Sequence, residues 1–140
     1  MNQAEIILRD PVLFTDLKQL VLEVGLVIIE IYRRENLAVQ IKHDQSPVTA
    51  ADLAAHQLIA EGLAYLTPHL IVVSEENKES HKQASSHEIY WLIDPLDGTQ
   101  EFINRNGEFT VNVALIERGC PSLGLVGVPV QEKLYWGGRG

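Results

Sequence analysis

Apolar side chains in the first half of the chain recur at helical spacing and predict two helices. The first is expected to begin at Asp10-Pro11, because aspartate is a good N-cap and proline suits the first helical position. Its apolar stripe, which continues to about Tyr32, comprises Leu13, Leu17, Leu20, Val21, Val24, Ile28 and Ile31. A second helix is expected from about Thr49, a capping residue, to just before Pro68. Its predicted inner face comprises Ala51, Ala55, Leu58, Ile59, Gly62 and Leu66.

Shorter apolar runs in the second half of the chain predict strands. Residues 70–73 and 90–93 are continuous apolar runs, which are typical of buried strands. Over residues 109–116 the side chains alternate in the strand pattern, and further strands are expected over 123–130 and from 134–136. Helices followed by a run of antiparallel strands indicate an α+β fold.

Carboxylates gather where the two buried runs end. The segment 94–99, DPLDGT, directly follows the second run, and Glu75-Glu76 follows the first after one serine. Because Pro95 restricts φ and Gly98 tolerates conformations that a Cβ would resist, a compact bend is expected. Mg²⁺ takes such oxygen ligands together with water and substrate phosphate. A plain turn is the alternative, since Asp-Pro and Asp-Gly are common turn formers, but the repetition at two strand ends favours a metal-phosphate site.

Composition and charge narrow the functional classes. The net charge of −8 argues against binding to nucleic acid, which calls for a basic face. No apolar run reaches the roughly 18 residues of a membrane-spanning helix, and the N-terminus lacks the apolar core of a secretion signal. Cys120 is the sole cysteine, so an intrachain disulfide is excluded and a reducing compartment fits. We expect a cytoplasmic location, with peripheral association at the inner membrane left open.

Three separated motifs resemble the inositol monophosphatase superfamily of magnesium-dependent, lithium-sensitive phosphatases. Glu75-Glu76, the segment 94–99 and Phe102 match its first signature. Residues 46–52 (SPVTAAD) and 101–112 (EFINRNGEFTVN) are closer to one branch, the bacterial 3'(2'),5'-bisphosphate nucleotidases. The resemblance covers nearly the whole chain. It implies two helices packed on a large antiparallel sheet, the N-terminal half of a layered sugar-phosphatase fold.

The resemblance also implies roles for particular residues around two or three Mg²⁺ ions. The metal ligands that it implies are Glu75, Asp94, the Leu96 carbonyl and Asp97. The substrate-binding residues that it implies are Glu75, Leu96, Asp97, Gly98 and Thr99. Free N–H groups of a short helix expected after Gly98 would receive the scissile phosphate.

Three residues are implied to be catalytic, namely Asp52, Glu75 and Thr99. Glu75 and Thr99 would position the attacking water, and Asp52 would accept a hydrogen bond from the Thr99 hydroxyl. Asp52 also has a purely structural interpretation, because the helix dipole favours a carboxylate in a first turn. A carboxylate has enough lone pairs for both interactions.

The family's second signature, a Trp-Asp-x-Ala-Ala-Gly-like segment with another metal-binding Asp, is not found in these 140 residues. We therefore expect residues 1–140 to form the N-terminal α+β metal-site domain of a longer enzyme whose C-terminal α/β half is absent from this chain. The glycines after Trp136 are expected to form a hairpin turn.

The activity implied for the complete enzyme is removal of the 3'-phosphate of adenosine 3',5'-bisphosphate, giving AMP and recycling a by-product of sulfate activation. Inositol monophosphatase activity is the alternative within the same fold, and a non-catalytic fragment that binds metal or a partner is the alternative of another class. The expected partner is the phosphorylated small molecule. The isolated chain is expected to turn over little substrate and to self-associate through surface left uncovered.

Overall fold

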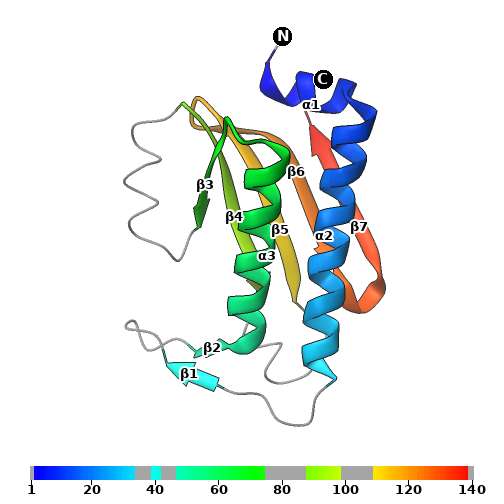
Figure 1. The fold of residues 1–140 in the computed structure, drawn as a ribbon, viewed down its shortest axis with the longest axis vertical. Helices are drawn as coiled ribbons and strands as arrows, with labels where there is room; N and C mark the ends of the chain where they lie inside the picture. The colour runs from blue at the N-terminus through cyan, green and yellow to red at the C-terminus, as the bar shows by residue number, and fades with distance from the viewer. Residues whose placement is uncertain (1, 34–38, 42–46, 75–87, 99–108, 139–140) are drawn as a thin grey trace.

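Two long helices lie across one face of a five-stranded sheet (Figure 1). The computed structural model describes residues 2–33, 39–41, 47–74, 88–98 and 109–138. The helices are α1 (Gln3–Arg9), α2 (Pro11–Tyr32), α3 (Ala50–Leu66) and the 3-10 helix η1 (Pro129–Gln131). The strands are β1 (Val39–Ile41), β2 (Pro47–Thr49), β3 (Ile71–Ser74), β4 (Ile89–Asp97), β5 (Thr110–Glu117), β6 (Cys120–Val128) and β7 (Lys133–Gly138).

Both predicted helices are confirmed. Helix α2 begins after Asp10, whose Oδ1 accepts a hydrogen bond from the Leu13 N–H at 3.1 Å. On α3 the predicted inner position Leu58 is wrong, because it is 38% exposed, and Leu63 is buried instead. Helix α1 was not predicted, although Asn2 caps it by accepting a hydrogen bond from the Glu5 N–H at 2.8 Å.

The large sheet is mixed, which corrects the prediction of an antiparallel sheet. Its strand order is β3-β4-β5-β6-β7, and β3 pairs with β4 in parallel, whereas the other neighbours are antiparallel. The chain between Ser74 and Ile89 is long enough for the return that parallel pairing needs, about a dozen residues or more. Strands β1 and β2 form a separate antiparallel pair between α2 and α3 in the chain.

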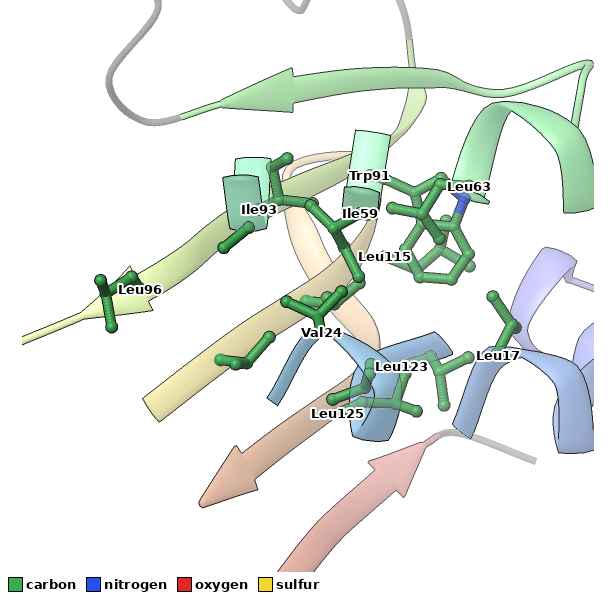
Figure 2. Packing of buried hydrophobic residues seen from close by; sticks show 14 of the residues in the cluster. Leu17, Val24, Ile59, Leu63, Trp91, Ile93, Leu96, Leu115, Leu123 and Leu125 are labelled. Atoms are coloured by element: carbon green, nitrogen blue, oxygen red, sulfur yellow. The ribbon is translucent and has the colours of Figure 1, made fainter. Parts of the chain in front are cut away.

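The core fills the space between the helices and the sheet (Figure 2). Trp91 of β4 is fully buried, and its Nε1 donates a hydrogen bond to Thr67 Oγ1 at 2.9 Å. The Thr67 hydroxyl in turn donates to the Leu63 carbonyl at 2.8 Å, which ties the end of α3 to the sheet. Gly127 allows α2 to approach β6, since a Cβ there would lie 3.0 Å from Val21 Cγ1.

The other side of the sheet, called the outer face from here on, carries the alternate residues of the strands. Cross-strand pairing connects its members across four strands, from β4 to β7. They are Leu92, Asp94, Asn112, Ala114, Gly124, Val126 and Tyr135. Among the described elements, α2 and α3 both pack on the opposite side (Figure 1).

Strand β7 runs further than expected. Gly137 and Gly138 continue it and pair with Gly124 and Leu123 of β6, so the hairpin turn predicted after Trp136 is wrong. Glycines suggested a turn, but pairing with β6 holds them in extended structure. None of the described helices has the length and apolarity needed to cross a membrane.

Candidate metal and phosphate site

Strand β4 contains one extra residue within its acidic segment. Asp94 pairs with Asn112 of β5, and Asp97 pairs with Thr110, so three steps along β4 match two steps along β5. This arrangement is a β-bulge, which bends a strand and re-aims its side chains. The bend expected from Pro95 is therefore a bulge within β4. Asp94 and Asp97 at its ends both remain paired with β5, so the acidic segment is not a plain turn outside the sheet.

The bulge brings both aspartates to the outer face. In a regular strand, residues three apart point to opposite faces, because side chains alternate with a period of two. Here Asn112, the cross-strand partner of Asp94, donates a hydrogen bond from Nδ2 to Asp97 Oδ2 at 3.1 Å. Between the aspartates, Leu96 belongs to the core cluster and is only 3% exposed (Figure 2).

Gly98 ends the acidic segment with a backbone conformation that few other residues adopt. Its φ is +90°, in the region where a Cβ causes steric strain. The prediction that Gly98 adopts a backbone geometry that a Cβ would resist is confirmed. Gly98 therefore permits the backbone to change direction directly after Asp97.

A pocket of about 240 Å³ opens on the outer face at this point. Asp94, Asp97 and Asn112 line it together with apolar residues of β4, β5 and β6. Carboxylate and amide oxygens are ligands for hard cations such as Mg²⁺. The polar groups that line the pocket therefore fit the metal that the sequence implies.

The carboxyl ends of β3 and β4 lie at the same edge of the sheet. Ser74, the last residue of β3, pairs in parallel with Ile93, the residue before Asp94. Glu75 follows Ser74 in the sequence, but it lies outside the described residues, as do Thr99 and the short helix predicted near it. Within the described part of the chain, no group of three or more His, Cys, Asp or Glu is arranged to hold a metal ion. Asp94 and Asp97 are therefore the two described carboxylates of the candidate site, and Glu75 stays a prediction.

Asp52 lies in the first turn of α3 and is 8% exposed. Figure 1 shows this turn at the end of the helix layer toward which β3 points. The position agrees with the helix-dipole interpretation of Asp52. Its predicted hydrogen bond with Thr99 stays a prediction, because Thr99 lies outside the described residues.

Asn112 is the polar residue at this site that sequence reasoning missed. The alternating pattern over 109–116 placed it on a strand, opposite to the apolar side. Its proximity to Asp94 and Asp97 follows only from the register between β4 and β5. A register of this kind cannot be read from one strand alone.

The fold is that of a known class. Residues 8–140 match the model of the Inositol monophosphatase family, and the chain belongs to that family. The α+β fold is confirmed by the solved structure of CysQ from Bacteroides thetaiotaomicron, a bacterial member of the inositol monophosphatase family. It superposes with a TM-score of 0.71 at 43% identity, over 85% of this chain and 43% of that one.

Curated relatives carry a more particular name. The 3'(2'),5'-bisphosphate nucleotidase CysQ of Salmonella typhimurium is 57% identical over 99 residues, which are 71% of this chain and 40% of that protein. The protein of the same name from Escherichia coli K12 is 49% identical over 123 residues, 87% of this chain and 50% of that one. The chain thus spans half or less of the length of these relatives.

Proposed function

We propose that residues 1–140 form the N-terminal, metal- and phosphate-binding half of a Mg²⁺-dependent 3'(2'),5'-bisphosphate nucleotidase. The complete enzyme would remove the 3'-phosphate of adenosine 3',5'-bisphosphate and release AMP and phosphate. The names of the relatives support this substrate class. A further α/β half, which carries the remaining metal ligand, belongs to the same proposal.

The observation that carries the proposal is the bulge in β4. It turns Asp94 and Asp97 to one face, beside the end of β3. Two carboxylates on one exposed face repel each other unless a cation lies near them. A fold that gathers them with oxygen-bearing neighbours is therefore suited to divalent cations and, through these, to phosphate.

The proposed ligands are Glu75, Asp94, the Leu96 carbonyl and Asp97. When bound, two or three Mg²⁺ ions would supply the positive charge that stabilises the phosphoryl group during hydrolysis, a reaction that is extremely slow without catalysis. Asp94 and Asp97, at the two ends of the bulge, would hold the ions through their carboxylate oxygens.

The chain's own residues would also orient the reactants. Glu75 and the Thr99 hydroxyl would hold the attacking water, with Asp52 accepting the Thr99 proton in a hydrogen bond. The backbone after Gly98 would offer N–H groups to the phosphate oxygens. Water would attack phosphorus and form the new P–O bond while the bond to the 3'-oxygen breaks, and a proton given up by that water would go to the leaving 3'-oxygen.

A chimaera tests the proposal. Residues 1–140 are joined to the part of the Salmonella relative beyond the aligned segment, and phosphate release is measured from adenosine 3',5'-bisphosphate and from inositol monophosphate. We expect Mg²⁺-dependent release from the nucleotide that Li⁺ inhibits, and little release by residues 1–140 alone. A strong preference for inositol monophosphate would contradict the nucleotidase assignment and favour inositol monophosphatase. Cation binding without turnover of either substrate would favour the non-catalytic alternative.

Location and assembly are part of the proposal. We propose a cytoplasmic protein, in keeping with its substrate. Peripheral association with the inner membrane has no support in the described residues or in the relatives, and we do not propose it. Self-association of the isolated chain is proposed through the outer face, where Val126 is 37% and Tyr135 54% exposed.

A further inference from the structure

We propose that Asn112 is a positioning residue that holds the Asp97 carboxylate in the orientation needed for a divalent cation. This inference rests on the proposed metal site and adds to it a residue on a different strand. In this role Asn112 would act on the cation through Asp97.

The geometry that supports this role is specific. Asn112 pairs with Asp94 across β4 and β5, yet its side chain bonds to Asp97, three residues further along β4. The Nδ2–Oδ2 distance of 3.1 Å is within normal hydrogen-bond range. Asn112 is thus the strand partner of Asp94 and, through its side chain, a hydrogen-bond donor to Asp97 at the far end of the bulge.

An amide suits this position chemically. The Asn112 NH₂ group donates to a carboxylate without adding a charge, whereas an aspartate there would add a third negative charge and a lysine would compete with the cation. The hydrogen bond engages Oδ2 of Asp97 and limits rotation of the carboxylate, so that Oδ1 keeps a defined direction. Asp97 is exposed, so packing alone does not fix its rotamer. Outer partners of this kind orient metal ligands and tune affinity.

The test uses the 140-residue chain and two NMR measurements. The first, without metal, is the three-bond coupling that reports the χ1 rotamer of Asp97. We expect one dominant rotamer in the unmodified chain and rotamer averaging in Asn112→Ala. The second is a Mn²⁺ titration followed by paramagnetic broadening of the Asp94 and Asp97 amides. We expect the apparent Kd to rise about tenfold in Asn112→Ala, with partial recovery in Asn112→Gln, which keeps the donor.

Gln57→Ala is the matched control. Gln57 Nε2 also donates to a carboxylate, Glu61 Oε1, at 3.1 Å on an exposed surface, but it does so on helix α3. This variant loses the same kind of bond and should leave both the Asp97 coupling and Mn²⁺ binding unchanged. A comparable change in thermal stability in both alanine variants would separate positioning from a general loss of structure.

The outcomes distinguish this inference from the proposed function. If Mn²⁺ binds at Asp94 and Asp97 but Asn112→Ala changes neither the coupling nor the Kd, the inference is wrong and the metal site stands. If Mn²⁺ does not broaden these amides in the unmodified chain, the proposed metal site is wrong, and the proposed role of Asn112 is wrong with it. Rotamer averaging of Asp97 in the unmodified chain would overturn the positioning role directly.

Discussion

The two faces of the five-stranded sheet differ in what covers them and in what they carry. One face packs under α2 and α3, and its largest side chain, that of Trp91, is fully buried and hydrogen-bonded. The outer face carries Asp94, Asp97 and Asn112 beside partly exposed apolar residues. The covered face therefore supplies most of the stability, whereas the outer face is available for chemistry and assembly. The bulge in β4 contributes to both faces of the sheet, because Leu96 points into the core and Asp97 points to the outer face.

The largest effect is expected from Trp91→Ala on the covered face. The substitution leaves a cavity and removes the donor to Thr67, and the free energy of unfolding should fall by about 3–5 kcal/mol. Tyr135→Ala on the outer face, where the ring is 54% exposed, should cost about 1 kcal/mol or less. Urea denaturation followed by circular dichroism measures both. Equal losses would contradict the contrast between the faces.

The next largest effect is expected from Asp94→Asn, measured as phosphate release by the chimaera. Removal of the negative charge of a proposed cation ligand should lower kcat more than about a hundredfold. The fold should be retained, because the side chain lies on the outer face and changes little in size. Asp16→Asn, an equal charge change at an exposed position of α2, is the control and should leave kcat unchanged. Activity of Asp94→Asn close to that of the parent would rule out the ligand role.

Gly98→Ala tests whether the backbone conformation at the end of the acidic segment is needed for stability and for Mn²⁺ binding. At a φ of +90° a Cβ causes strain, so we expect a loss of about 1–2 kcal/mol in stability and weaker Mn²⁺ binding at Asp97. Gly137→Ala is the control, because a Cβ there would meet no atom within 4 Å and its φ is not in the strained region. Denaturant titration and the Mn²⁺ titration are the measurements. A Gly98 variant as stable as the Gly137 variant would show that the conformation is not required.

The smallest effect is expected from Tyr135→Lys, which tests assembly. A lysine on the outer face should weaken self-association of the isolated chain about tenfold, equivalent to about 1.4 kcal/mol. Tyr65→Lys on α3, where the tyrosine is 86% exposed, should not change it. Light scattering over a range of protein concentrations gives the comparison. An unmodified chain that stays monomeric at every concentration would exclude the proposed contact.

Local signals in the sequence were sufficient for much of the fold. Asp10-Pro11 marked the start of α2, because capping and the fixed φ of proline act over a few residues. Gly98 was predicted to need conformational freedom, and it has a positive φ. The acidic segments were found because they directly follow buried strands. Asn2, the N-cap of α1, is a local signal of the same kind.

Only the tertiary structure decided which side chains meet. The parallel pairing of β3 with β4 and the bulge between Asp94 and Asp97 depend on contacts between distant segments, which no single segment encodes. Pairing with β6 likewise kept Gly137 extended where a turn was predicted. Asn112 became a neighbour of Asp97 for the same reason. By itself, the sequence determined the kinds of residues at the strand ends, because composition and local propensity act within one segment. The strand register decided which of those residues share a face, and the register depends on many weak contacts spread over the whole sheet.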